Sequence, residues 1–532
     1  MRLHGRLAAA WPALVVAGAV AAFAAQARPD FDLIVRGGTV VDGSGRPGVR
    51  ADVGVRDGRV AAIGELGGRA ARETIDASGL VVAPGFIDVH THADDVAETP
   101  RAESFVRMGV TSIVAGNCGS SALDVGAVLA HVREVGVSVN FATLVGHNTV
   151  RSAVLGSEDR PPNASELTKL RALVWKGMAD GAVGFSTGLQ YVPGVYATSF
   201  EIITLARVAA DAGGIYASHM RNEGTSIEAA VDETIRVGRA AGCPVEISHL
   251  KIDSPSRWGR AAQVLALIDQ ARERGEDVSA DQYAYTAGAS GLGIRFPAWA
   301  LEGGMGRIRQ RLDDPETWAR MKTEMRELIA ERGFEDLSFA VVASYREDPS
   351  LDGLSMKQVA MRLLGDDSPD AQLEAARAML RNGGAQMVYH FMSEGDLEAF
   401  MKHPQVAVAS DASINTPGQG MPHPRGYGNN ARVLGEYVRR RGVIPLEEAV
   451  RKMTSLPARH FRLAGRGLVA EGYAADLTIF DPARVDGPAT YEAPHAYATG
   501  IPFVVVNGVV VVRDGEHTGA RPGQIMTLER RE

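Results

Sequence analysis

The stretch Pro84-Gly-Phe-Ile-Asp-Val-His-Thr-His92 ends an apolar segment in two histidines spaced by one residue. Side chains at positions i and i+2 of a strand point to the same face of a sheet, so the imidazoles of His90 and His92 can reach one metal ion. Such a pair is weak evidence alone, because His-x-His is often incidental. Because this pair follows an apolar run, the residues at the ends of the other apolar runs are also candidate ligands.

Apolar runs alternate with longer helical stretches through the middle of the chain. The runs lie at residues 81–89, 112–115, 140–145, 183–186, 215–218, 245–248 and 406–410. This alternation predicts an α/β fold with a parallel sheet, and the number of units fits a (β/α)8 TIM barrel. Residues at the C-terminal ends of barrel strands form the active site in that fold. Here those residues are Cys118, His219, His249 and Asp411.

The two ends of the chain carry short β-rich runs bounded by Gly and Asp. We predict that residues 28–83 and 456–532 together build one small β-sandwich domain, and that the barrel spans residues 84–455. Charged helical sequence at about 296–382 interrupts the rhythm of the barrel. We interpret it as an inserted segment that forms a lid over the barrel mouth.

Residues 1–27 have the pattern of a secretory signal peptide. Arg2 and Arg6 precede an apolar run at 7–25, and Ala25-Gln-Ala27 supplies a small-x-small ending. The alternative is an uncleaved membrane anchor, since a run of about 19 residues could just span a bilayer. The alanine-rich makeup and the ending favour cleavage. We expect an exported, periplasmic protein without stable membrane insertion after signal removal.

Composition argues for a globular protein that acts on a small molecule. Hydrophobic residues make up 45% and charged residues 23%, and the net charge of -8 comes with no dense Lys/Arg run, so a nucleic-acid partner is not expected. Cys118 and Cys243 could form one disulfide in an oxidising compartment. Their contexts differ, because Cys118 lies in Gly-Asn-Cys-Gly after a strand and Cys243 lies in a Gly-Cys-Pro turn. We interpret Cys118 as chemical and Cys243 as structural.

In combination, these motifs resemble the amidohydrolase superfamily and, within it, the N-acyl-D-amino-acid deacylases, also called D-aminoacylases. The likeness covers nearly all of the chain after the signal. It rests on Pro84-Gly-Phe-Ile-Asp-Val-His-Thr-His92, Gly116-Asn-Cys-Gly119, Gly146-His-Asn-Thr-Val-Arg151, Phe185-Ser-Thr-Gly-Leu-Gln-Tyr191, His219-Met-Arg-Asn-Glu223, Ser248-His-Leu-Lys251, Asp281-Gln-Tyr-Ala-Tyr285, Ser410-Asp411 and His423-Pro-Arg425. Many binuclear relatives have a bridging Lys after the strand at Gly184. Its absence is typical of D-aminoacylases, in which a Cys is a ligand, and Cys118 matches that Cys.

The resemblance implies one tight zinc site, and the residue types agree with it. Cys118, His219 and His249 would supply three protein ligands and leave one position open for water, as a catalytic zinc needs. His90 and His92 would form a second, weaker metal position or would stabilise the oxyanion. Asp411 would take a proton from water and pass it to the leaving amine. An Asp at this place could instead be an N-cap or turn residue.

The resemblance also implies how a substrate carboxylate is held. Arg425 and Lys251 would bind it, and the pocket would be completed by Tyr191, by Tyr283 or Tyr285, and by Ser290. The chain departs from the family pattern at Ala284, where Pro is common, and in a longer segment at residues 412–422. These departures affect the reach of Arg425 and the shape of the side-chain pocket.

The implied function is zinc-dependent hydrolysis of an N-acyl-D-amino acid to a carboxylate and a D-amino acid. Two rivals remain open: an amidohydrolase acting on a dipeptide, a cyclic amide or an aromatic amide toxin, and a catalytically inactive binding protein. The retained Cys, His and Asp residues argue against the second rival. His147 either touches substrate or packs behind the site. His390, His403, His460, His495 and His517 match no site motif, and we expect them at the surface or in packing.

Overall fold

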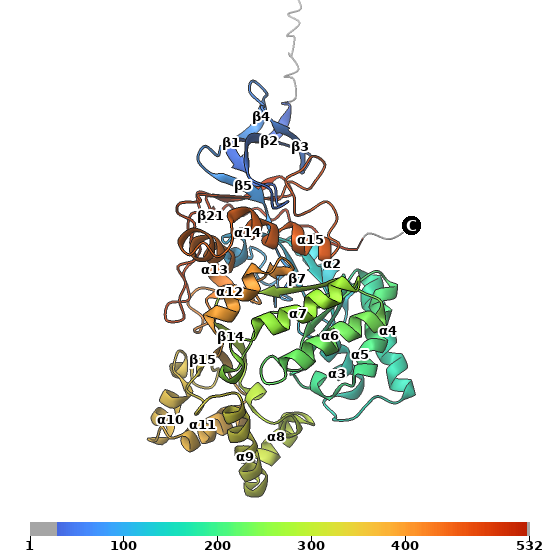
Figure 1. Cartoon of the computed structure of the whole chain (residues 1–532), viewed down its shortest axis with the longest axis vertical. Helices are drawn as coiled ribbons and strands as arrows, with labels where there is room; N and C mark the ends of the chain where they lie inside the picture. Colours follow the sequence, from blue (N-terminus) through green and yellow to red (C-terminus); the bar gives the residue numbers. More distant parts are fainter. Residues whose placement is uncertain (1–28, 529–532) are drawn as a thin grey trace, which may run out of the picture.

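The structure is a computed structural model and describes residues 29–528. The predicted signal at residues 1–27 lies outside this range. Figure 1 shows three parts along the long axis of the molecule: the N-terminal strands at one end, a barrel in the middle, and helices α8–α11 at the other end. Among the described residues, no helix is both long and apolar enough to cross a membrane.

Strands from both ends of the chain share one nine-stranded sheet. The connection is direct, because β18 (Leu477–Phe480) pairs antiparallel with β5 (Val81–Pro84). The order is β21-β20-β19-β18-β5-β1-β2-β3, with β4 beside β1. The remaining bounds are β1 Phe31–Val40, β2 Val49–Arg56, β3 Arg59–Gly64, β4 Ala71–Asp76, β19 Phe503–Val506, β20 Val509–Arg513 and β21 Glu516–His517. The strands of this sheet come from the two end segments that the sequence analysis assigned to one small β-domain.

Parallel strands form the centre of the molecule. They make two sheets, with orders β6-β7-β8 and β9-β10-β11-β12-β13-β17. Only Leu144 separates β8 from β9, and an isolated parallel bridge between Thr91 and Ala412 joins the segments that follow the first strand of the series and the last. The bounds are β6 Phe86–Asp88, β7 Val110–Ala115, β8 Asn140–Thr143, β9 Val145–Gly146, β10 Gly184–Gly188, β11 Ile215–His219, β12 Val245–Ile247, β13 Val278–Gln282 and β17 Val406–Val408. The parallel α/β class predicted from the sequence is confirmed.

Helices alternate with these strands and cover the outside of the barrel (Figure 1). Their bounds are α1 Glu103–Val106, α2 Val125–Val135, α3 His147–Leu155, α4 Ala164–Asp180, α5 Ser199–Asp211, α6 Ile227–Ala241, α7 Ala261–Glu273, α12 Glu394–Lys402, α13 Arg425–Arg432, α14 Leu446–Met453 and α15 Ser455–His460. A π-helix at Val433–Arg440 extends α13.

The segment between β13 and α12 has a hydrophobic core of its own, from Leu292 to Phe391. It extends beyond the bounds of 296–382 expected for the insertion. Its strands form a small antiparallel sheet in the order β14-β16-β15. The bounds are β14 Ala287–Gly291, α8 Gly304–Asp313, α9 Pro315–Glu331, β15 Ala340–Ser344, α10 Met356–Leu364, α11 Pro369–Arg381 and β16 Gln386–His390.

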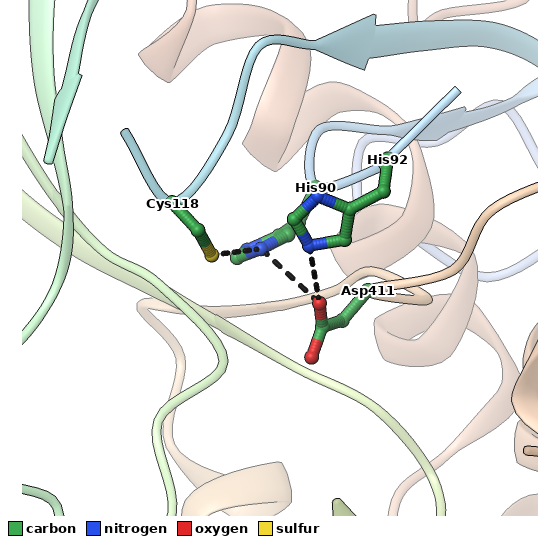
Figure 2. A group of neighbouring side chains, drawn as sticks. All are labelled: His90, His92, Cys118 and Asp411. Carbon is green, nitrogen blue, oxygen red and sulfur yellow. Dashed lines mark hydrogen bonds and ion pairs between the residues drawn. The ribbon is translucent and has the colours of Figure 1, made fainter. Parts of the chain in front are cut away.

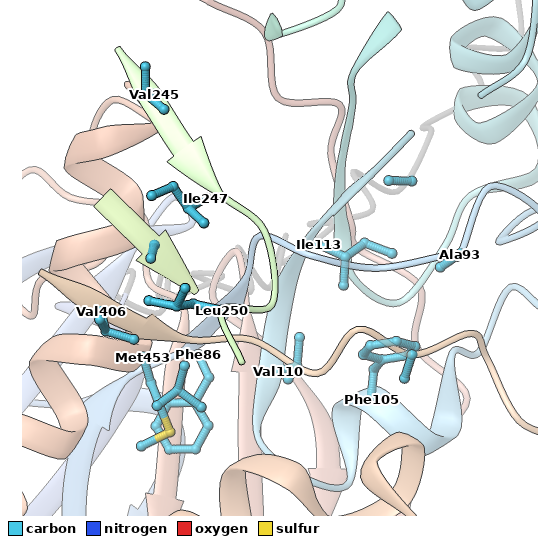
Figure 3. Close-up of a cluster of buried hydrophobic side chains, with 14 of the residues drawn as sticks. Phe86, Ala93, Phe105, Val110, Ile113, Val245, Ile247, Leu250, Val406 and Met453 are labelled. Atoms are coloured by element: carbon cyan, nitrogen blue, oxygen red, sulfur yellow. The ribbon is translucent and has the colours of Figure 1, made fainter. Parts of the chain in front are cut away.

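The barrel strands are buried on both faces, which explains why they appear in the sequence as short apolar runs rather than as alternating ones. Every residue of β7, β11 and β12 is buried. Figure 3 shows Val245 and Ile247 of β12 in the hydrophobic core. Because side chains alternate along a strand, Glu246 between them faces the opposite side. This rigid core holds the strand ends, and therefore the polar residues that follow them, in fixed places.

Candidate metal centre and active site

The residues predicted at the strand ends converge at one end of the barrel. Cys118, His249 and Asp411 follow β7, β12 and β17, and their φ angles are 52°, 37° and 53°. Residues other than glycine rarely adopt this left-handed conformation, and held strain of this kind clusters at functional sites. The backbone turns at these three residues therefore aim their side chains at a common centre.

The first group of possible ligands comprises His90, His92, Cys118 and Asp411 (Figure 2). The Nε2 atom of His90 lies 3.3 Å from Sγ of Cys118 and 3.4 Å from Oδ1 of Asp411. The same Oδ1 atom lies 3.0 Å from Nε2 of His92. The two histidines separated by one residue thus face the same centre, as their spacing predicted.

The second group comprises Cys118, His219 and His249, so Cys118 belongs to both groups. Its Sγ atom lies 3.4 Å from Nε2 of His249, and that nitrogen lies 2.7 Å from Nδ1 of His219. All three residues are buried. A thiolate shared between two groups is the arrangement expected of a cysteine that bridges two metal positions.

Acidic side chains and histidines of the centre stabilise each other's charged forms. Burial raises the pKa of Cys118, but His90 and His249 outweigh it and hold this pKa well below its usual value. Burial lowers the pKa of His92, but Asp411 and Cys118 outweigh it and raise the pKa to about 10. The centre therefore contains a thiolate and carboxylates that require compensating positive charge.

These residues fit a zinc ion. Thiolate sulfur, imidazole nitrogen and carboxylate oxygen are its usual ligands. The nitrogens of His219 and His249 approach to 2.7 Å, a separation at which a proton between them, or a cation bound to both, prevents repulsion of their lone pairs. The second group, Cys118 with these two histidines, would hold one zinc and leave a position open. The first group would hold another.

Carboxylates outside the two groups orient the histidines. Asp281 contacts Nδ1 of His90 at 3.1 Å and accepts a hydrogen bond of 2.8 Å from the backbone N–H of His249. Glu223 lies 2.9 Å from Nδ1 of His249. The two contacts to the rings of His90 and His249 engage Nδ1 and leave Nε2 free to bind a metal, which is the usual arrangement of metal-binding histidines.

Arg425 and Asp411 form the polar boundary of the centre. Burial raises the pKa of Asp411, but Arg425 and the nearby histidines outweigh it and hold the pKa well below the usual value. His423 fixes the arginine, because its Nδ1 accepts a 3.1 Å hydrogen bond from the backbone N–H of Arg425 while Nε2 contacts the carbonyl of Ala287 at 2.8 Å. Nη1 of Arg425 lies 2.7 Å from Oδ2 of Asp411, and its Nε has no hydrogen-bond partner among the described residues.

Two cavities meet at Tyr191, Ser290 and Asp411. The narrow cavity has a volume of about 20 Å³ and is lined by Lys251, Tyr283 and Arg295 among others. The wide cavity has a volume of about 680 Å³ and opens outward. It is lined by His92, Cys118, Ser120, Asn148, Ser344, Gln386, Met387, Asn415, Gln419 and Arg425, with other residues of the segment 412–422. The inserted segment contributes walls to both cavities.

A model described as the amidohydrolase family matches residues 73–512 of the chain. The chain is a member of the amidohydrolase family. The D-aminoacylase of Alcaligenes xylosoxydans xylosoxydans is 38% identical to it over 524 residues, which cover 93% of this chain and 97% of the relative.

Two solved structures extend this comparison for the amidohydrolase. The N-acyl-D-glutamate deacylase of Bordetella bronchiseptica, solved with zinc and a phosphonate inhibitor that mimics the tetrahedral intermediate, is 36% identical, with a TM-score of 0.80 over 93% of this chain and 99% of that one. A D-aminoacylase with a binuclear metal centre, activated by one metal and attenuated by the second, is also 36% identical, with a TM-score of 0.81 over 93% of this chain and 100% of that one.

Some predicted residues of this amidohydrolase lie away from the two cavities. Tyr285 lines neither of them, whereas Tyr283 lines the narrow cavity; the rings of both tyrosines lie edge-on to His423. His147 is buried against Glu201 at 2.9 Å and likewise lines neither cavity. Neither Cys118 nor Cys243 is in a disulfide, so the bond that the sequence left open between them is absent. Of the two tyrosines offered for the pocket, only Tyr283 lines a cavity.

The sequence analysis missed three polar residues of the site: Glu223, Asp281 and Arg295. Two of them had a usable signal. Glu223 lies four residues after His219 within a quoted motif, and Asp281 begins the quoted motif that closes with the two tyrosines. Arg295 had no signal, because it belongs to the inserted segment and reaches the narrow cavity only through the packing of that segment.

Proposed function

We propose that this amidohydrolase cleaves the amide bond of N-acyl-D-amino acids, releasing a carboxylate and a D-amino acid. The observation that carries the proposal is Cys118, which is shared by two groups of metal ligands and flanked by Asp411 and Arg425. A metal centre beside a buried arginine whose Nε has no hydrogen-bond partner among the described residues suits an amide next to a free carboxylate. The relatives that act on N-acyl-D-amino acids support the choice of substrate and its D configuration.

Zinc is the proposed metal, with one tight position at Cys118, His219 and His249 and a second, weaker one at His90 and His92 with Cys118 and Asp411. When bound, zinc polarises the scissile carbonyl and lowers the pKa of water toward neutrality. Asp411 accepts a proton from the attacking water at Oδ1, the oxygen that faces the histidines, and delivers it to the departing nitrogen. The depressed pKa of Asp411 supports this role, because it keeps the group ionised before the reaction.

The substrate carboxylate is assigned to Arg425 and Lys251. Nη1 of Arg425 pairs with Oδ2 of Asp411 at 2.7 Å, its Nε is buried without a hydrogen-bond partner among the described residues, and the guanidinium group lies over the ring of Tyr283 at 4.6 Å. Lys251 lines the narrow cavity, and its Nζ lies 2.8 Å from Glu223, 2.9 Å from Nδ1 of His249 and 3.1 Å from the carbonyl of His249, so a substrate carboxylate would have to share the ammonium group with these partners. The hydroxyls of Tyr191 and Ser290, 3.4 Å apart where the cavities meet, complete the binding surface.

The two cavities divide the substrate at the scissile bond. We assign the amino-acid side chain to the narrow cavity and the acyl group to the wide one, which has room for acyl groups much larger than acetyl. The narrow cavity favours a slim, acidic side chain. Its three acids are already engaged, since Glu223 contacts Lys251, Asp253 contacts Arg332 and Asp411 contacts Arg425. By contrast, Nε of Arg295 is buried without a hydrogen-bond partner in the described part of the chain.

Three further assignments belong to this proposal. The inserted segment acts as a lid, a role supported by its contribution of residues such as Ser344 and Arg295 to the cavity walls. The terminal strands form the β-sandwich domain. Residues 1–27 direct export to the periplasm, where they are removed. N-terminal sequencing of exported protein tests the last assignment, because a chain that begins at Met1 would contradict it.

A substrate panel tests the proposed function. Zinc-loaded enzyme is assayed with matched N-acetyl-D- and N-acetyl-L-amino acids, with dipeptides and with hydantoins. We expect turnover of the D series and a preference for acidic side chains. Turnover confined to dipeptides or hydantoins would support the rival amidohydrolase function. Binding of N-acyl-D-amino acids without turnover would instead support an inactive binding protein.

A further inference from the structure

Cys118 lies on a tight turn, residues 116–119, that follows β7. The φ angles of Gly116, Cys118 and Gly119 are 75°, 52° and 75°, so three of the four residues have the left-handed conformation. Among these three, Cys118 carries a Cβ atom, which makes this conformation unfavourable for it. Its side chain projects from the turn toward His90 (Figure 2). Contacts from outside the turn must therefore maintain its shape.

The turn crosses the carboxyl end of β9 and reaches β10. A Cβ atom at Gly146, the last residue of β9, would lie 2.4 Å from the carbonyl oxygen of Gly119. A Cβ atom at Gly116 would lie 2.3 Å from the carbonyl oxygen of Leu144. Side chains cannot approach a backbone so closely, so glycine is required at both crossings. The turn thus packs against the neighbouring strand backbone on backbone.

Two residues on one face of β10, Ser186 and Gly188, receive the turn. The hydroxyl group of Ser186 donates a 2.5 Å hydrogen bond to the carbonyl of Gly116 and accepts a 3.1 Å hydrogen bond from the backbone N–H of Gly119. One group therefore joins the two ends of the turn. Gly188 leaves room for the carbonyl oxygen of Cys118, because a Cβ atom there would lie 2.1 Å from it.

The hydrogen bonds of Ser186 complete the support of the turn. Ser186 is fully buried, and buried backbone groups such as the two that it contacts cost free energy when they are unpaired. On the opposite side, Nδ2 of Asn117 donates to the carbonyls of Val89 at 3.2 Å and of Val114 at 2.9 Å. Asn117 thus fixes the turn to the strand that precedes His90, and Ser186 fixes it to β10.

We propose that Ser186 is a positioning residue for Cys118: its hydroxyl group clamps the two ends of the turn 116–119 and so directs the sulfur toward both groups of metal ligands. This inference rests on the proposed role of Cys118 as the shared ligand. Alanine would fill nearly the same space as Ser186 and would lose only the clamp. Because Cys118 belongs to both groups, loss of the clamp affects both metal positions.

Ser186→Ala tests the clamp, with Thr187→Val as the matched control. Thr187 is the next residue of β10 and points to the other face, where its hydroxyl lies 2.9 Å from that of Tyr216. Thr187→Val therefore removes a buried hydroxyl from the same strand without reaching the turn. We titrate both variants with cobalt and follow the thiolate-to-cobalt charge-transfer absorption. Ser186→Ala should bind cobalt about 10- to 100-fold more weakly at both positions, as is typical when the support of a ligand is lost. Thr187→Val should match the wild type.

A second readout needs no metal. The chain has two cysteines, so in a Cys243→Ala background Cys118 is the one thiol left. Its rate of alkylation by iodoacetamide in metal-free protein reports how often the turn opens. Ser186→Ala should react about 10-fold faster, the factor expected from losing roughly one net hydrogen bond, and Thr187→Val should react at the wild-type rate. Gly188→Ala displaces the carbonyl of Cys118 and keeps the hydroxyl of Ser186. It should also speed alkylation, and it carries the test if Ser186→Ala does not fold.

An unchanged alkylation rate in Ser186→Ala would overturn the proposal, as would full cobalt binding by a variant that reacts faster. Equal changes in Thr187→Val would also overturn it, because they would indicate a general loosening of β10. Failure of the wild type to bind cobalt would refute the metal assignment and leave the alkylation rates to decide the role of Ser186.

Discussion

Arg425 and Asp411 form a buried ion pair in which Nη1 of the arginine lies 2.7 Å from Oδ2 of the aspartate. The other carboxylate oxygen, Oδ1, faces His92 at 3.0 Å. The two oxygens of one carboxylate therefore have separate surroundings, one on the substrate-binding side and one on the metal side. A substrate carboxylate that engages Arg425 will weaken its pull on Asp411 and raise the proton affinity of the proposed base.

Asp411→Asn keeps the size of the side chain but removes the proton acceptor. We expect kcat to fall by at least about 10²-fold, because general acid-base catalysis typically contributes 10² to 10⁴-fold and this residue serves two steps. Zinc content at Cys118, His219 and His249 should stay unchanged, and KM should change little. Steady-state kinetics on zinc-replete protein check this. A kcat near wild type would remove Asp411 from the mechanism and make His90 or His92 the proton acceptor.

Arg425→Ala should raise KM about 10- to 100-fold, because hydrogen bonds to a charged group contribute roughly 1.5 to 3 kcal/mol. It should also shift the acid limb of the plot of kcat against pH to higher pH. Arg425 holds the pKa of Asp411 down, so its removal raises that pKa, and the active carboxylate is then lost at a higher pH as the pH falls. Kinetics across a pH series measure both effects.

Arg432→Ala is the matched control for this prediction. Arg432 ends the same helix, α13, and lines neither cavity. Its Nε atom donates a hydrogen bond to the carbonyl of Ala284. KM and the acid limb should match the wild type in this variant. An acid limb that stays in place in Arg425→Ala would show that Asp411 does not control it.

The residues that bind a metal could be predicted because each one ends an apolar strand. The strand, the following turn and the ligand are adjacent in the sequence, and the barrel fold then brings their ends together. For this reason His90, His92, Cys118, His219, His249 and Asp411 converge as expected.

The surroundings of these residues could not be predicted, because they depend on packing between distant segments. The contacts of Asp281 with His90 and of His460 with Glu246 join residues that are 191 or more positions apart in the sequence. Tyr283 and Tyr285 were equivalent in the sequence, and only the path of the chain beyond β13 places the first in the cavity wall and the second under Arg432. Long-range placement of this kind leaves no local pattern.

Cys118→Ala should remove both metals, because Cys118 belongs to both groups of ligands. His90→Ala should remove only the weaker one and leave zinc at Cys118, His219 and His249. Zinc per chain, measured by elemental analysis after dialysis against a weak chelator, distinguishes the two variants. Cys243→Ala is the control, since this half-buried thiol lies outside both groups and should leave zinc unchanged. Full zinc retention by Cys118→Ala would refute the shared-ligand arrangement.

Arg295 determines the preference for an acidic side chain if the narrow cavity is assigned correctly. Its guanidinium group lies 4.3 Å from the ring of Tyr389, which fixes its place in the cavity wall, and its Nε atom has no partner within the described chain. Arg295→Met keeps a long side chain and removes the charge. We expect kcat/KM for an N-acetyl amino acid with an acidic D side chain to fall about 10- to 100-fold, the effect of losing one charge-assisted hydrogen bond. For a D-amino acid with a neutral, unbranched side chain of similar length, kcat/KM should stay level or rise, because an apolar wall then replaces a cation. The ratio of the two values is the measurement, since a general loss of activity cancels in it. An unchanged ratio in Arg295→Met would show that the side chain is not recognised in the narrow cavity and would move it to the wide one.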